Sequence, residues 1–493
     1  MRERTTAITI FITLVLAYAF VFPRWLDWNA NARLDLSAAI VEHGTLAIDV
    51  YAQNTGDYAL FNGHQYIDKA PGLSFLGVPV YWVVHRLTRP EVVQNFIDAI
   101  GRTPATAATI NRPIDQVTRE ELIFASRVAL TTGIIVGVSS AVLGVVLFTF
   151  LGRLNYPARW RALAVLIYGI ATPAFTYSAA FYGHQVAAVL LFGAFAWLQA
   201  LRTRSARPIE WLIIGGLLGY AVITEYPAVL IAALIGMYAI WITRRVLPVT
   251  LIAVGGLIPI GLWGAYNTAI FGTPFALGYQ YTADPRWSAI LSIGLLSANM
   301  PTPEAIWGLT FNPFRGLFCV SPILLLSLPG LVMLRRSIFR AEWITTLSIV
   351  LGFFILVSAS AQWWGGWSAG PRYLVPMLPF LVWPLTATCD RMARMTSGWR
   401  VGAWLITIGL AVVSLVHVWS LTLGGQYYAP DDIMSPLVEY SWPHIMAGDV
   451  ARNWGMIFGL HGAASTLPLL LLVCGATGLI WIVTRPSMQK KAL

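Results

Sequence analysis

Apolar stretches close to the length of a bilayer crossing recur along the whole chain, and they constrain its fold more than any other feature. Of the 493 residues, 57% are hydrophobic and only 11% are charged, which is roughly half the charged share of a soluble protein. This pattern predicts an all-α, polytopic membrane protein with about twelve transmembrane helices. The expected spans are residues 7–24, 122–150, 161–181, 185–201, 209–224, 227–242, 247–270, 317–334, 343–361, 373–388, 401–420 and 464–484.

One further apolar run, residues 73–87, is short and contains Pro79. Arginines cluster in every second connection between the expected spans, and Arg2 and Arg4 precede the first span. Positive charge marks cytoplasmic connections, so all these clusters share the cytoplasmic side only if 73–87 does not cross the membrane. We therefore expect 73–87 to be an interfacial or re-entrant helix, and both termini to be cytoplasmic.

This topology places three long segments on the extracytoplasmic side of one membrane-embedded domain, 1–493, in a plasma (inner) membrane. The segments are residues 25–121, 271–316 and 421–463. Within the first, residues 31–43 have the apolar spacing of an amphipathic helix, and Gly44 would end it. We read the apolar N-terminal stretch as an uncleaved first span rather than as a removed signal sequence.

The first external segment carries a group of ionisable residues beside the membrane surface: Asp49, Asp57, His64, Asp68 and Lys69. A Pro-Gly turn and an apolar run follow Lys69, which should hold this lysine at the interface. An ammonium group there is a point charge suited to a phosphate. The alternative interpretation is an ordinary solvated loop.

Arg372, in the stretch QWWGGWSAGPRY, stands at the outer end of a span, where positive charge is disfavoured. This position favours a phosphate partner, and Arg315 is a weaker instance of the same placement. His184 and Glu225 lie at external helix ends, where an ionisable group suggests function. Their alternatives are a hydrogen-bonded structural histidine and a glutamate facing water.

Several classes of function are disfavoured. Cys319, Cys389 and Cys474 are scattered and form neither a disulfide framework nor a metal-binding spacing. The sequence has no phosphate-binding Walker loop and no zinc-protease motif. The net charge of +10 is explained by topology, so we expect no nucleic-acid partner. No metal site and no certain cofactor are predicted, although a divalent cation stays open.

External carboxylates and an interfacial basic pair together suggest one chemistry. Lys69 and Arg372 would neutralise a lipid-linked phosphate, while an aspartate deprotonates an acceptor hydroxyl that attacks an anomeric carbon. A transporter or flippase for a lipid-linked or anionic substrate is the main alternative, and a catalytically silent protein is the third. A transporter favours ionisable residues deep in several spans, and these are scarce here.

The stretch LDLSAAIVEHG, followed by G..Y.DKAPG and an apolar helix, resembles the GT-C superfamily of polyprenyl-phosphate-sugar-dependent glycosyltransferases. The similar branch contains protein O-mannosyltransferases and aminoarabinose transferase. The resemblance carries over to Tyr66, Asp68, Lys69 and Pro71, and it implies that Lys69 contacts the lipid phosphate. It also implies transfer of a sugar to a protein, lipid or glycan acceptor on the extracytoplasmic face, among membrane lipids.

The chain departs from the pattern of this superfamily at two places. The Asp-Glu pair that usually opens the acidic helix aligns onto Asn29-Ala30 or Asn31-Ala32, and His184 holds a place often taken by aspartate. The catalytic base is therefore left open among Asp35, Asp49 and Asp57. The residues expected to contact substrate are His64, Tyr66, Asp68, His184 and Glu225.

Overall fold

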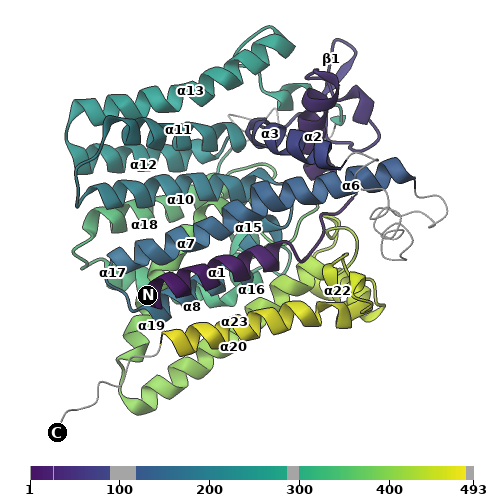
Figure 1. Ribbon diagram of the computed structural model, residues 1–493. Coiled ribbons are helices and arrows are strands. Elements are labelled where there is room, and N and C mark those ends of the chain that lie inside the picture. The colour runs from purple at the N-terminus through teal and green to yellow at the C-terminus, as the bar shows by residue number, and fades with distance from the viewer. Residues whose placement is uncertain (1, 26, 89–117, 286–298, 485–493) are drawn as a thin grey trace.

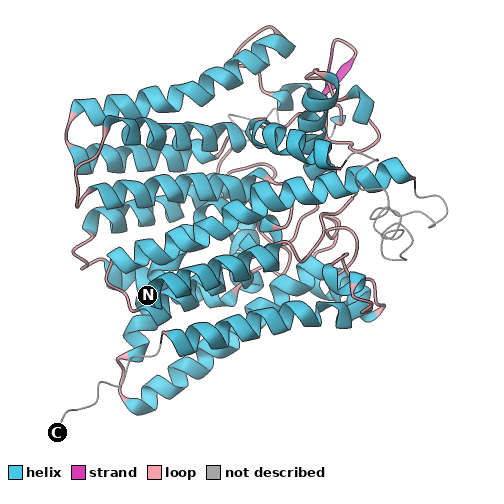
Figure 2. Cartoon of the chain, in the orientation of Figure 1, coloured by secondary structure: helices cyan, strands magenta, loops and turns pink. Residues whose placement is uncertain are grey.

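The computed structural model describes residues 2–25, 27–88, 118–285 and 299–484. Helices dominate it and lie side by side in one bundle (Figures 1 and 2). By length and composition, six helices in the described part of the chain could cross a membrane. They are the continuous helix Arg119–Arg153 (α6, η4 and α7), α10 (Gly183–Leu201), α13 (Val246–Phe271), α18 (Arg340–Ser358), α20 (Ser397–Leu423) and Gly462–Val483 (η9 and α23). The chain is a polytopic helical membrane protein.

Further helices complete the bundle: α1 (Arg2–Tyr18), α8 (Ala158–Ile170), α11 (Pro208–Thr224) and α12 (Ala228–Thr243). Prolines interrupt three of the expected spans, because proline lacks the backbone N–H that continues a helix. Each of the three is built from shorter helical pieces. These pieces are α8 with α9 (Ala174–Ser178), then α16 (Leu317–Val320) with η6 (Pro322–Leu326) and α17 (Ser327–Leu334), and η7 (Arg372–Leu381) with α19 (Val382–Ala393).

Glycines allow α11 and α13 to touch backbone to backbone. A Cβ atom added at Gly215 would lie 1.9 Å from the carbonyl oxygen of Ile252, and one at Gly255 would lie 2.0 Å from that of Leu212. Small residues at helix contacts are the usual means of close packing in a membrane. The two helices therefore form one tightly joined pair.

The two ends of the bundle differ in character. The N-terminus lies at one end (Figure 1). Arginines of two connections lie there too, since Arg161 pairs with Glu3 and Arg202 pairs with Glu342 at 2.5 Å. The opposite end carries α2 (Trp28–Ala38), α3 (Gly72–Leu87) and the small β hairpin.

Helix α3 lies across this second end and does not pass through the bundle. It begins on the last turn of α11, where the Tyr220 hydroxyl donates to the Gly72 carbonyl at 2.9 Å. It ends beside α6, where Arg127 donates to Thr88 at 3.1 Å. Both neighbours lie at the end that carries α2, which agrees with the expectation of a non-crossing helix at 73–87.

Helix α2 continues into η1 (Ala39–His43) and ends at Gly44, whose φ of +64° suits a glycine. The end agrees with the expected helix, but the start lies three residues earlier than expected. Beyond η2 (Asp49–Tyr51), strands β1 (Ala59–Phe61) and β2 (His64–Tyr66) pair antiparallel, with Phe61 opposite His64. This hairpin is a small addition to an otherwise helical chain.

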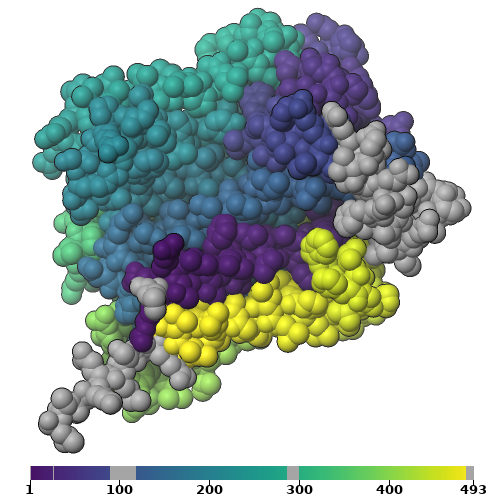
Figure 3. All heavy atoms as spheres, in the orientation of Figure 1, coloured from purple at the N-terminus to yellow at the C-terminus, as the bar shows by residue number. Residues whose placement is uncertain are grey.

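The segment after α1 pairs with a segment close to the C-terminus. Phe22 donates its backbone N–H to Arg452 at 2.8 Å, and Trp454 donates to Phe20 at 3.1 Å. Helices α1 and α23 also pack along each other (Figure 3). The remaining short helices, η5 (Gly278–Tyr281), α15 (Pro303–Thr310), η8 (Pro436–Ser441), α21 (Trp442–Met446) and α22 (Trp454–Ile457), belong to loops between the long ones.

Candidate active site

A cavity of about 1100 Å³ opens at the end of the bundle that carries α2 and α3. Its wall comes from the start of α2, the Lys69 segment, the ends of α10 and α11, and the loops 362–373 and 426–433. Six of the predicted site residues line it: Asp57, Asp68, Lys69, His184, Glu225 and Arg372. Residues from distant parts of the sequence therefore meet here.

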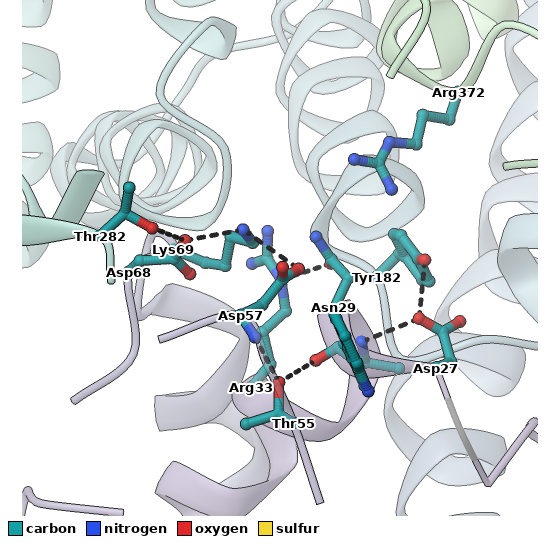
Figure 4. Close-up of polar contacts among 12 residues, drawn as sticks. Asp27, Asn29, Arg33, Thr55, Asp57, Asp68, Lys69, Tyr182, Thr282 and Arg372 are labelled. Carbon is teal, nitrogen blue, oxygen red and sulfur yellow. Dashed lines mark hydrogen bonds and ion pairs between the residues drawn. The ribbon is translucent and has the colours of Figure 1, made fainter. Parts of the chain in front are cut away.

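Lys69 is held between two carboxylates (Figure 4). Its Nζ lies 2.9 Å from Asp68 and 3.3 Å from Asp57, and Thr282 donates to Asp68 at 3.2 Å. Burial lowers the pKa of Lys69, but the two carboxylates more than offset this and raise it above its usual value. Lys69 is therefore a charged ammonium with two of its three donors directed at carboxylates.

Arg372 is a buried cation with little to neutralise it. Its side-chain contacts are one long hydrogen bond to the Tyr373 hydroxyl, at 3.5 Å, and the rings of Tyr182 and Tyr373. No carboxylate in the described part of the chain lies within 4.0 Å of the guanidinium, and its Nε has no acceptor. A buried charge without a partner is costly, so this arrangement favours an anion as the missing partner.

Arg24 is a second cation in the same wall. Its guanidinium stacks 4.1 Å from the Tyr428 ring centre and donates to the Thr422 carbonyl at 2.7 Å. Within the described ranges it makes no ion pair with a carboxylate. The cavity thus contains two guanidinium groups that form no direct ion pair with a carboxylate among the described residues.

Asp27 is the residue that sequence reasoning missed. It is the N-cap of α2, and its Oδ1 accepts hydrogen bonds from the Ala30 N–H at 3.3 Å and the Tyr182 hydroxyl at 2.8 Å. Burial raises the pKa of Asp27, while those hydrogen bonds and the charges of Arg372 and Arg24 oppose the rise. The available signal was an aspartate directly before an amphipathic helix, but the expected helix began three residues too late to reveal it.

Four of the predicted site residues do not line the cavity. Asp35 is fully buried elsewhere on α2, where it accepts a hydrogen bond from Asn54 at 3.1 Å. Burial raises the pKa of Asp35 well above its usual value. Asp49, in η2, pairs at 2.8 Å with His64 of the exposed hairpin, and Tyr66 belongs to that hairpin as well. Asp57 is thus the only one of the three proposed bases beside the cavity.

Arg33, Glu225 and His184 form a buried polar chain in the wall of the cavity. Arg33 lies 2.8 Å from Glu225, whose other oxygen lies 3.4 Å from His184. Arg33 also donates to the carbonyl of Ala70, next to Lys69, at 3.2 Å. The predicted residues His184 and Glu225 therefore connect α10 and α11 to α2 and to the lysine segment.

The described residues contain no group of three or more histidine, cysteine or acidic side chains that could hold a metal ion. Cys319, Cys389 and Cys474 are free thiols. The side chains that line the cavity carry guanidinium, ammonium, carboxylate, imidazole, amide and aromatic groups.

No family model and no curated protein matches the sequence. Among solved structures, ArnT from Cupriavidus metallidurans in the apo state is similar, with 14% sequence identity and a TM-score of 0.50, over 97% of this chain and 73% of that one. ArnT from the same organism bound to undecaprenyl phosphate matches at 14% identity and a TM-score of 0.46, over 98% and 74%. At this identity the similarity to the apo structure concerns the fold. The chain therefore has a fold similar to that of ArnT, at low sequence identity.

Proposed function

We propose that the chain transfers a sugar from a polyprenyl-phosphate-linked donor to an acceptor hydroxyl in this cavity. The observation that carries the proposal is the buried guanidinium of Arg372, which faces a large cavity without a carboxylate partner in the described chain. A lipid phosphate supplies the missing negative charge, and the cavity lies at the end of a membrane-embedded bundle. The GT-C-like fold supports the same reaction class.

Arg372 and Arg24 are the main phosphate ligands in this proposal. Guanidinium groups bind phosphate oxygens through paired hydrogen bonds, and both arginines have donors available. Lys69 contributes its third N–H, since Asp57 and Asp68 occupy the other two. Its role in this proposal is smaller than the sequence suggests, because two carboxylates already balance its charge.

Asp27 is the proposed base. Its Oδ1 is occupied by Ala30 and Tyr182, which leaves Oδ2 for an acceptor hydroxyl. The carboxylate takes the hydroxyl proton, and the acceptor oxygen forms a bond to the anomeric carbon. The bond from that carbon to the phosphate oxygen breaks, and the lipid phosphate leaves with the electron pair, stabilised by the arginines.

The proposed orientation is extracytoplasmic for the cavity. The arginine-bearing connections beside Glu3 and Glu342 lie at the end with the N-terminus, and basic residues favour the cytoplasmic side. The cavity lies at the opposite end (Figure 1). A polyprenyl-phosphate donor would then be used after its sugar has reached the outer leaflet.

Sugar transfer from a panel of undecaprenyl-phosphate sugars in isolated membranes tests the proposal. Asp27→Asn should lower the rate by roughly 10²–10⁴-fold and leave undecaprenyl phosphate binding unchanged. Asp49→Asn, in η2 and away from the cavity, is the matched control and should keep wild-type activity. Full activity in Asp27→Asn together with loss in Asp57→Asn would move the base to Asp57.

The same assay separates the competing functions. A transporter or flippase would bind undecaprenyl phosphate through Arg372 and move the lipid without cleaving the bond to the sugar. A catalytically silent protein would bind and neither move nor cleave it. The buried chain of Arg33, Glu225 and His184 gives a transporter little support, because His184 and Glu225 stand at helix ends rather than at mid-span.

A further inference from the structure

Arg315 lies in the short connection between α15 and α16, far in sequence from Arg372, and its side chain is fully buried. The surrounding backbone is fixed locally. The Asn312 side chain accepts the Phe314 N–H at 2.8 Å, and the Gly316 N–H donates to the Asn312 carbonyl at 2.8 Å. The guanidinium stacks 4.0 Å from the Phe314 ring centre. These contacts therefore hold the Arg315 side chain in one orientation.

The guanidinium binds three backbone carbonyls instead of a carboxylate. It donates to Trp364 at 3.1 Å, to Gly366 at 2.9 Å and to Phe314 at 3.0 Å. A planar fork of fixed donors suits two carbonyls held at a set separation. Two of the three carbonyls flank Gly365, so Arg315 holds that residue from both sides.

The loop that Arg315 holds packs directly against Arg372. Gly365 and Gly366 have φ values of +77° and +63°, which favour glycine. A Cβ atom added at Gly365 would lie 3.0 Å from Nε and 3.1 Å from Cγ of Arg372. The backbone at Gly365 thus forms the surface on which the Arg372 side chain rests.

The same loop reaches the other wall of the cavity, where the Trp364 indole N–H donates to Asp431 at 3.2 Å. Within the described ranges, Arg372 has one long side-chain hydrogen bond of its own. Its direction therefore depends on packing against the loop rather than on a polar partner.

We infer that Arg315 is a positioning residue: by binding the carbonyls of Trp364 and Gly366, it holds the loop that directs Arg372 toward the donor phosphate. This inference rests on the proposed function. Arg315 does not itself touch the phosphate in this arrangement. Its effect reaches the substrate through the loop and Arg372.

Arg315→Lys tests the inference, because lysine keeps the charge and loses the fork. Hydrogen–deuterium exchange of purified protein should become at least tenfold faster for the amides of residues 364–370. Affinity for undecaprenyl phosphate should fall by roughly tenfold, the equivalent of one charge-assisted hydrogen bond of about 1.4 kcal/mol. Arg161→Lys is the matched control, since Arg161 is also buried and stacks on a phenylalanine, but at the opposite end of the bundle. It should change neither measurement.

A double-mutant cycle shows whether the effect passes through Arg372. In an Arg372→Met background, Arg315→Lys should have no further effect on lipid-phosphate affinity, because the group it positions is gone. Additive losses, or unchanged exchange in Arg315→Lys, would overturn the inference and leave the proposed function standing. A different result would overturn the proposed function, and the positioning role with it: the wild-type protein binds no undecaprenyl phosphate, although Arg315→Lys still makes exchange faster.

Discussion

Replacing Arg372 by methionine should weaken function and strengthen the fold at the same time. The guanidinium is buried, and within the described residues its only polar side-chain contact is 3.5 Å long. Removing a buried cation that lacks a partner should stabilise the protein by about 1–3 kcal/mol. Methionine has a similar length and fills the space without a charge.

The loss of donor affinity follows from the same geometry. A phosphate bound by two charge-assisted hydrogen bonds gains at least about 3 kcal/mol from them, since each contributes about 1.5–3 kcal/mol. Arg372→Met should therefore raise the dissociation constant for undecaprenyl phosphate by roughly 100-fold. Equilibrium binding and thermal unfolding of the same detergent-purified protein give both quantities.

Arg202→Met should have the opposite effects, with lower stability and unchanged binding of the lipid phosphate. Arg202 pairs at 2.5 Å with Glu342, which is fully buried, so its loss leaves a buried carboxylate without its cation. That change should destabilise the protein by about 1–3 kcal/mol, since Arg202 is partly exposed and Tyr238 still donates to Glu342, and it should leave lipid-phosphate affinity unchanged. The reasoning is refuted if Arg372→Met lowers the unfolding temperature as Arg202→Met does, or if it binds the lipid as tightly as wild type.

Three other predictions follow from the structure. Burial raises the pKa of Asp27, so activity should be lost as the pH falls through that raised pKa. The hydrogen bond from Tyr182 lowers the pKa of Asp27, so Tyr182→Phe should move the acid limb of the pH–rate profile to higher pH. Gly215→Ala should destabilise the protein by at least about 1–3 kcal/mol in thermal unfolding, because its Cβ would strike a carbonyl of α13, whereas Gly216→Ala should be tolerated. A cysteine replacing the exposed Val50 should react with an impermeant maleimide from the extracytoplasmic side of intact cells, and labelling from the cytoplasm alone would reverse the proposed orientation.

The sequence predicted the membrane fold well because its signals are repetitive. Apolar length and the spacing of arginines are read from many residues at once, so a few local errors do not alter the result. The charge pattern also predicts that α3 does not cross the membrane, and its position across one end of the bundle agrees with this. The breaks within spans, such as the one before Pro173 between α8 and α9, divide a helix without changing the overall architecture.

The site was harder to predict, because it depends on which face of a helix turns inward. Asp35 and Asp27 lie two turns apart on and beside α2, yet only Asp27 lines the cavity. A shift of three residues in the expected helix start was enough to hide the N-cap. The partners of Lys69 and the support of Arg372 by Arg315 join segments that no local pattern connects.

The pairing of residues 20–24 with residues near 450 has a consequence for biosynthesis. A membrane protein is made and inserted from its N-terminus onward, so Arg24 and Asp27 leave the ribosome among the first residues. Tyr428, which Arg24 contacts in the cavity wall, and residues 452–454, which pair with Phe20 and Phe22, are made much later. The cavity is consequently complete only when nearly the whole chain has been synthesised.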